Sequence, residues 1–386
     1  MLVAKCVKAI YGLKQAPRHW NENLDRTMLS LGFAASVSDP FLYSRVRKCK
    51  QLYVAIYVDD LIISGTDLRT VHEFKLEMKQ RYNMKDLGQL KYCLGMEVFY
   101  DNNGSCISIG QQKYARDLLT KFGRMNCRPA SVPLDPGLKL SVSMAPQTDE
   151  EKVEANKYPY REIVGSLMYL MTCSRPDLSY AVGVLAKYMN CHGKQHHAAA
   201  DHVLRYVRGT IDMKLTYGGD YHHDPFCVVG YSDSDWAANV DNRRSTTGYM
   251  FMLGGGPISW KSKSQPTVAL SSTEAEYMAL SSAAQEAIAL KKLCTDLKVY
   301  MPSTRCPILI NEDNKGAIAM SVNPVMHQTS KHIDIRHHFI REKVAMGDVT
   351  LSYISTEDML ADALTKPLGK SQFLRLRCKY MTGGDS

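Results

Sequence analysis

The sequence predicts three successive structural regions: an α+β region with a small antiparallel sheet, a helical region, and an α/β region with a mixed sheet. Two strand-like segments, 51–58 and 61–64, meet at an Asp-Asp turn and indicate the antiparallel sheet. Apolar residues at helical spacing recur through residues 157–222. After residue 223, three strands precede a long helix and strands then alternate with helices, an order typical of a mixed sheet covered by helices.

Apolar spacing and turn residues define the elements expected before residue 127. In the first helix, Trp20, Leu24, Met28 and Leu31 lie three or four residues apart and therefore share one face. A later pair of strands is separated by Asp-Asn-Asn-Gly, a typical hairpin signal. The expected elements are helices 16–31 and 67–82 and strands 51–58, 61–64, 92–99 and 105–109.

A change of composition separates this region from the helices that follow. Residues 127–156 contain four prolines and few apolar residues, which predicts a linker or an extended segment. Pro176 suits the first turn of a helix and marks the start of the second of three expected helices. These helices are 160–173, 177–191 and 196–209.

The last region contains the most regular alternation of elements. Three strands are expected first, two of them joined by a Gly254-Gly255-Gly256 turn, and a further short strand is expected through Val268 to Leu270. The expected order is strands 226–232, 247–253 and 257–262, helix 273–299, strand 307–311, helices 314–321 and 331–345, strand 349–354 and helix 357–366.

Composition and charge indicate a soluble protein that contacts a polyanion. The 386 residues include 48 Lys and Arg against 39 Asp and Glu, and the excess lies before residue 223, where 30 basic residues face 22 acidic ones. Neutralisation of phosphates supplies most non-specific nucleic-acid affinity, so the first part is the expected nucleic-acid grip, although an inert basic surface would have the same composition. The eleven cysteines include no Cys-x-x-Cys pair, which favours reduced thiols.

No segment has the composition of a membrane anchor or a secretion signal. No run of about eighteen apolar residues occurs, and the N-terminus lacks the pattern of a signal peptide. We therefore expect an intracellular protein, cytoplasmic or nuclear, that does not bind a membrane.

Asp59 and Asp60 interrupt one of the most apolar runs in the chain. Taking each carboxylate out of water costs several kcal/mol, so a bound cation or a hairpin tip open to a substrate explains the pair best. A solvated turn is the alternative, because Asp is common in turns.

The motif Tyr57-Val58-Asp59-Asp60 resembles the metal-binding hairpin of reverse transcriptases, which implies that Asp59 binds metal. Segments 9–18 and 86–98 are similar to stretches of copia-type retrotransposon Pol polyproteins, and the resemblance continues to about Gly369. It implies a truncated palm and thumb-like region at 1–126, a linker at 127–156, a helical connection at 157–222, a ribonuclease H-like domain at 223–369 and a C-terminal tail at 370–386. The first region would then be a palm remnant.

The same resemblance implies that four acids, Asp233, Glu276, Asp313 and Asp362, bind two Mg²⁺ ions, with Mn²⁺ as an alternative. Such a pair, roughly 3.5 to 4 Å apart, supports in-line cleavage of a phosphodiester. Neighbouring acids leave alternatives open. Asp235 shares a strand face with Asp233 and would serve if the strand runs on, whereas Glu274 is expected to cap its helix. The choice of Asp313 over Glu312 follows the register of the family.

The resemblance also implies that a further polymerase aspartate lies upstream of Tyr11, so RNA-directed DNA polymerase activity is expected to be lost unless a separate chain supplies the missing half. The expected activity is metal-dependent cleavage of RNA in RNA-DNA hybrids, with Lys14, Arg18 and Lys261 as phosphate contacts. The alternatives are a non-catalytic nucleic-acid-binding remnant of a transposable element and a reading frame that is rarely or never expressed.

Overall fold

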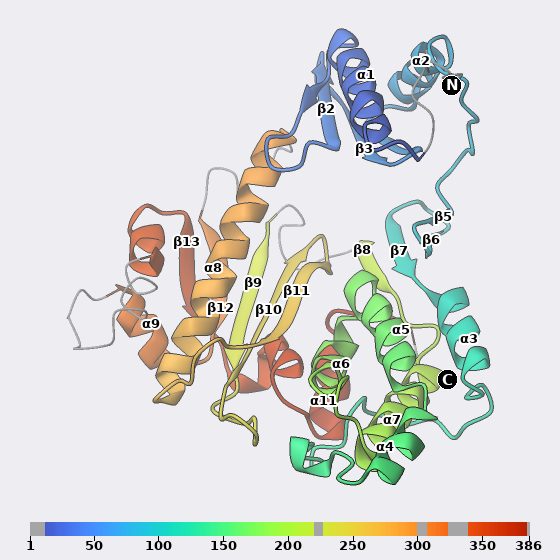
Figure 1. Cartoon of the computed structure of the whole chain (residues 1–386). Coiled ribbons are helices and arrows are strands. Elements are labelled where there is room, and N and C mark those ends of the chain that lie inside the picture. Colours follow the sequence, from blue (N-terminus) through green and yellow to red (C-terminus); the bar gives the residue numbers. More distant parts are fainter. Residues whose placement is uncertain (1–11, 220–226, 299–306, 323–338, 384–386) are drawn as a thin grey trace, which may run out of the picture. The chain divides into compact units, whose positions relative to one another are not determined.

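The computed structural model describes residues 12–219, 227–298, 307–322 and 339–383. The chain forms two compact units, residues 1–90 with 289–300 and residues 91–288 with 301–386 (Figure 1). The domain borders expected from the sequence remain predictions. Among the helices in the described ranges, none is long and apolar enough to cross a membrane.

The first unit is an antiparallel sheet with two helices. Its strands β1 (Ala34–Ala35), β2 (Leu42–Arg47), β3 (Lys50–Tyr57) and β4 (Asp60–Gly65) follow one another in sequence order, with α1 (Ala16–Ser30) before them and α2 (Leu68–Lys79) after them. Alternate residues of β3, Leu52, Val54 and Ile56, are buried against Met28 and Phe74 of the helices. The period-two burial explains why an apolar strand ends in an exposed polar turn.

A four-stranded antiparallel sheet opens the second unit. It consists of β5 (Tyr92–Cys93), β6 (Met96–Tyr100), β7 (Cys106–Gly110) and β8 (Leu215–Gly218), and α3 (Gln112–Lys121) follows β7. The single strand expected at 92–99 is wrong, because Leu94 and Gly95 have φ values of 49° and 72° and turn the chain between β5 and β6. Such angles suit Gly and exclude a continuous strand.

Short helices form the connection region. They are η1 (Val142–Met144), α4 (Asp149–Asn156), α5 (Tyr160–Cys173), η2 (Pro176–Leu178), α6 (Ser179–Ala186) and α7 (Lys194–Gly209). The expected linker thus contains a helix, α4. This helix begins with a capping box between Thr148 and Glu151. The helix expected at 177–191 is divided into η2 and the shorter α6.

Two buried polar clusters lie among these helices. Arg175 donates two hydrogen bonds to the Asp177 carboxylate, at 2.9 and 2.7 Å, and the Tyr206 hydroxyl donates to the same carboxylate at 2.6 Å. In the second cluster, His192 Nδ1 and His197 Nε2 share a hydrogen bond of 2.9 Å. Both clusters tie α7 to the segments that precede it.

The central sheet of the second unit has the order β11-β10-β9-β12-β13 (Figure 1). Its strands are β9 (Val229–Ser234), β10 (Thr246–Leu253), β11 (Gly256–Ser264), β12 (Ile308–Glu312) and β13 (Val349–Tyr353), and its helices include α8 (Ser272–Asp296) and α9 (Lys315–Val322). β9, β10 and β11 are antiparallel, whereas β12 runs parallel to β9 and β13. The expected mixed sheet is confirmed, and so is the order of three strands, a long helix and then alternating strands and helices, which supports a ribonuclease H-like domain.

One expected strand of this region is wrong. Residues 268–270 form no strand. Val268 and Leu270 are exposed, and only Ala269 is buried, in a small cluster with Ala275 and Met278 of α8. The apolar residues that suggested a strand therefore belong to an irregular segment that leads into the helix.

The end of the chain differs from the expectation in two places. The helix expected at 357–366 consists of two short 3₁₀ segments, η4 (Thr356–Asp358) and η5 (Leu360–Leu364). Met359 between them has an extended backbone, with ψ of 103°, and Pro367 lacks the N–H that a longer helix would need. Residues 370–386, expected as a tail, contain α11 (Lys370–Arg377), in which Phe373 and Leu376 are buried. The first part of the helix expected at 331–345 lies outside the described residues.

A continuous apolar core joins the connection helices to the central sheet. Met250 and Met252 of β10 face this core, whereas Tyr249, which alternates with them, donates a hydrogen bond of 3.2 Å to Glu286 of α8. The core contains residues of α3, α5, α6, α7, β10, η5 and α11. The helical connection is therefore part of the packing that holds the central sheet.

Candidate metal centre

Asp233 lies near the carboxyl end of β9, the central strand of the sheet, and is only 1% exposed. β10 and β12 pair with the two edges of β9, so this carboxylate lies where three strands end together. The Thr365 hydroxyl donates a hydrogen bond to Asp233 Oδ2 and fixes its orientation. Asp235, two residues on, accepts from the Thr246 N–H and is buried separately.

Glu276 reaches the same place from the beginning of α8 and is 7% exposed. Glu274 has a different role. Its backbone N–H donates to Ser271 Oγ at 3.1 Å, and its carboxylate accepts from the Leu270 N–H at 2.8 Å. Glu274 therefore stabilises the start of the helix, as expected, although the capping residue is Ser271.

Asp313 follows β12 directly and completes a group of three acids. Asp233, Glu276 and Asp313 each offer one carboxylate oxygen, and these oxygens all lie within 4.8 Å of one another. Asp313 is partly exposed, and the Thr356 hydroxyl donates to its Oδ2 at 2.7 Å. Three acids from three separate elements thus converge at one end of the sheet.

Asp362, the fourth expected acid, lies in η5 and is not part of this group of three. It is fully buried, and Lys366 Nζ lies 2.8 Å from its Oδ1, while Gln372 donates to its Oδ2 at 3.2 Å. The same ammonium lies 3.9 Å from Asp233 Oδ2. Lys366 therefore links Asp362 to the acid group.

Sequence reasoning assigned no role to Lys366, Thr365 or Gln372. Lys366 follows Asp362 by four residues, a spacing at which side chains on a helical segment meet. This spacing could have indicated the ion pair from the sequence. Gln372 lies in α11, which was expected as a tail. No pattern in the sequence indicates that its amide reaches Asp362.

Burial and mutual repulsion disfavour ionisation of these acids. Burial raises the pKa of Asp233 and of Glu276 well above the usual range, and the charges of neighbouring acids raise both further, whereas Lys366 opposes the shift at Asp233. Glu312, fully buried beside Asp313, has a raised pKa for the same reasons. Burial also raises the pKa of Asp235 to about 6. The cluster therefore cannot keep all of its carboxylates ionised unless a further positive charge is added.

The donor set fits a hard divalent cation. Glu276 Oε2 and Glu312 Oε2 are buried oxygens that have no hydrogen-bond partner among the residues that the structure describes. Carboxylate oxygens are the ligands that Mg²⁺ and Mn²⁺ prefer, and a cation beside them would compensate charge that the protein leaves unpaired. The geometry is compatible with divalent metal binding at Asp233, Glu276 and Asp313.

The Asp59-Asp60 pair lies at an exposed hairpin tip in the first unit. Tyr57 pairs with Asp60, so Val58 and Asp59 form a two-residue turn between β3 and β4. Val58 has φ of 52°, which is unusual for a β-branched residue. Both carboxylates are exposed and thus avoid the desolvation cost that a buried pair would carry. Neither belongs to a group of three potential metal ligands among the described residues.

The three expected phosphate contacts are exposed cations. Lys14 precedes α1, and Arg18 in α1 donates a hydrogen bond of 2.8 Å to Glu22. Lys261 in β11 lies 5.7 Å from the centre of the Tyr249 ring. Their role in binding nucleic acid remains a prediction.

Comparisons with known proteins decide the family. The family model described as "Reverse transcriptase (RNA-dependent DNA polymerase)" matches residues 2–136. The chain is 40% identical to the Pol polyprotein from transposon TNT 1-94 of Nicotiana tabacum over 99% of its own length. It is 31% identical to a putative transposon Ty5-1 protein of Saccharomyces cerevisiae and covers 87% of that protein. The chain belongs to the copia-type retrotransposon Pol family.

This Pol chain spans about a quarter of the first relatives it matches. It covers 28% of the TNT 1-94 polyprotein and 25% of the transposon RE1 polyprotein of Arabidopsis thaliana, to which it is 39% identical. Two solved ribonuclease H structures overlap with 36% and 40% of the chain, one isolated from compost at 14% identity and one from Mycobacterium tuberculosis at 11%, each with a TM-score of 0.28. The fold assignment therefore rests on the strand order.

Proposed function

We propose that this retrotransposon Pol chain cleaves the RNA strand of RNA-DNA hybrids with divalent metal ions, Mg²⁺ in the cell and Mn²⁺ as a substitute, in the cytoplasm or the nucleus. The observation that carries the proposal is the convergence of Asp233, Glu276 and Asp313, which come from different elements and offer oxygens within 4.8 Å. Asp362 is the fourth carboxylate of the proposal, because Lys366 links it to Asp233.

The acidic residues and the threonines beside them have different roles in this proposal. When two ions are bound at such a site, they activate a water molecule and stabilise the leaving oxygen of a phosphodiester. Asp233 and Glu276 are buried and would hold the ions from the protein side, whereas Asp313 is partly exposed and would hold them where solvent and substrate can approach. Thr365 and Thr356 fix the orientations of Asp233 and Asp313, so the ligands are positioned before substrate arrives.

Cleavage of a labelled RNA-DNA hybrid, with and without Mg²⁺, tests the proposal. We expect Mg²⁺-dependent products from the wild type, none from Asp313→Asn, and wild-type rates from Asp117→Asn, which removes an exposed carboxylate of α3. Equal rates for wild type and Asp313→Asn would remove Asp313 from the mechanism. Salt-sensitive hybrid binding without any Mg²⁺-dependent product would identify a non-catalytic nucleic-acid-binding remnant instead.

We propose further that the chain does not extend a primer by itself. Polymerisation with two ions needs carboxylates from separate strands, because adjacent residues of a strand point to opposite faces. Within the described residues, no third acid accompanies Asp59 and Asp60. Incorporation of dNTPs on a primed RNA template by the purified chain would contradict this proposal, whereas incorporation only after addition of a second Pol chain would support it.

A further inference from the structure

Lys366 is held between two carboxylates that the proposed function assigns to metal binding. Its ammonium lies 2.8 Å from Asp362 Oδ1 and 3.9 Å from Asp233 Oδ2. Among the described residues, Lys366 is the only cation with an ion pair to either of these acids. Burial alone would lower the pKa of Lys366, but Asp233 and Asp362 raise it.

The acid cluster is divided into two parts by this lysine. Asp233, Glu276 and Asp313 each offer an oxygen within 4.8 Å of the others. The Lys366 ammonium instead lies beside Asp362 Oδ1 and Asp233 Oδ2, at 2.8 and 3.9 Å. A divalent ion can bind the first part without disturbing Lys366. An ion bridging Asp233 and Asp362 would occupy the region where the ammonium now lies.

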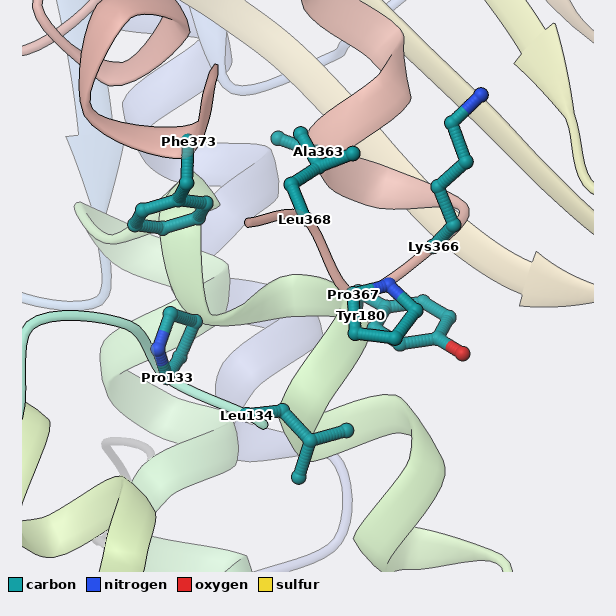
Figure 2. A pocket seen from close by; sticks show the side chains of 8 residues that line it. All are labelled: Pro133, Leu134, Tyr180, Ala363, Lys366, Pro367, Leu368 and Phe373. Atoms are coloured by element: carbon teal, nitrogen blue, oxygen red, sulfur yellow. The ribbon is translucent and has the colours of Figure 1, made fainter. Parts of the chain in front are cut away.

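The backbone of Lys366 is fixed, but its side chain can move away from the two carboxylates into solvent. Pro367 follows it, and Tyr180 and Leu134 lie beside them around a small hollow of about 10 Å³ (Figure 2). Figure 2 shows the lysine stem extending away from Pro367 and Tyr180. The side chain is 36% exposed, and a flexible four-carbon stem can carry its strongly hydrated charge into solvent.

We infer that Lys366 is a built-in competitor of the second divalent ion: the first ion binds at Asp233, Glu276 and Asp313, and the second must displace the ammonium from Asp233 and Asp362. This inference rests on the proposed function. It assigns Lys366 a positioning role, because the lysine acts through Asp362 and Asp233. The consequence is a site that takes up one ion readily and the second only when its concentration is high or when a phosphate adds further ligands.

Counting bound Mn²⁺ by electron paramagnetic resonance tests the inference without measuring activity. We expect wild type to bind one Mn²⁺ tightly and a second weakly. In Lys366→Met the second ion should bind at least about tenfold more tightly, within the usual range of coupling between competing sites. Lys370→Met, which removes an exposed lysine of α11, should bind as wild type does, and Lys366→Arg, which keeps the charge, should retain the weak second site.

Thermal unfolding provides a second measurement that does not depend on stoichiometry. Lys366→Met removes the partner of two buried acids, so the metal-free variant should unfold at a lower temperature than wild type, and Mn²⁺ should raise its unfolding temperature by more than it raises that of wild type. Lys366→Gln, a second neutral variant, should behave in the same way if the methionine variant fails to fold.

The outcomes separate the two proposals. Unchanged affinity for the second ion in Lys366→Met and Lys366→Gln, with the first ion bound normally, would overturn the role of Lys366 and leave the metal centre intact. If wild type bound no Mn²⁺, or if Asp233→Asn left binding unchanged, the metal centre itself would be wrong and the inference would fall with it. Loss of the second ion in Asp362→Asn, with the first retained, would support the division of the cluster.

Discussion

Replacement of Glu276 by Gln should stabilise the metal-free protein. Glu276 is 7% exposed, and within the described part of the chain its Oε2 has no hydrogen-bond partner. Burial and the charges of three neighbouring acids raise its pKa well above the usual range. Gln keeps the size of the side chain and removes the charge. Above about pH 4.5 the unfolded chain ionises Glu276 freely, whereas its burial among other acids opposes ionisation in the folded protein, and Gln removes this penalty. One pKa unit corresponds to about 1.4 kcal/mol, so we expect the free energy of unfolding in EDTA at neutral pH to rise by about 1–3 kcal/mol. At about 2–4 °C for each kcal/mol, the unfolding temperature would rise by several degrees.

Addition of Mg²⁺ should reverse this order. Wild type then gains the free energy of metal binding, which Glu276→Gln loses in large part. Glu274→Gln is the matched control, because it changes an acid of the same helix that accepts a backbone hydrogen bond outside the cluster, and it should lower stability slightly in both conditions. The assay is thermal unfolding of the three proteins in EDTA and in Mg²⁺. A Glu276→Gln protein that is less stable than wild type in EDTA would refute the reasoning that the metal-free cluster is electrostatically strained.

Two further predictions concern the polar clusters of the connection. Asp177→Asn leaves the buried Arg175 guanidinium without its counter-charge and should lower the free energy of unfolding in urea by about 3–5 kcal/mol. Replacement of both residues by apolar ones should recover most of that loss. A cost below about 1 kcal/mol for the single variant would contradict this. Burial, with the nearby charges of His192 and His196, lowers the pKa of His197 to about 4, which is below its unfolded value. The contribution of His197 to stability is therefore complete above about pH 6.5 and is lost as the pH falls toward 4. His197→Gln should reduce this loss between pH 7 and pH 5, measured as the difference in urea midpoint from wild type; an unchanged difference would show that another group is responsible.

The sequence predicts the regular elements best where periodicity and turn residues agree. The helix expected at 160–173 has the same bounds as α5, and the strands around Gly254 and Gly255 form the expected hairpin, because both glycines have positive φ values that suit a tight turn. The gathering of Asp233, Glu276 and Asp313 was expected from the family resemblance, and strand order accounts for the places of Asp233 and Asp313. An acid at the end of a strand lies at a predictable edge of the sheet.

Features that depend on packing could not be predicted in this way. α11 has few apolar residues, and its burial depends on partners that are far away in sequence, such as Tyr206 against Phe373. Whether Lys366 turns toward the acids or toward solvent depends on the 3₁₀ geometry of η5 and on Pro367, which hydrophobic periodicity does not report. The same limit explains why Asp362 was expected in a regular helix.

The apolar core that joins the connection helices to the central sheet determines which mutations this protein can tolerate. The buried residues of that core begin at Ala115 and continue to Met381, so it includes the connection and α11 but no residue of β1 to β4. Substitutions of apolar residues in β1 to β4 would therefore remove no side chain from this core. A frameshift shortly before Phe373 would instead remove Phe373, Leu376, Tyr380 and Met381 from that core at once, so a short change near the end of the gene would disturb the second unit.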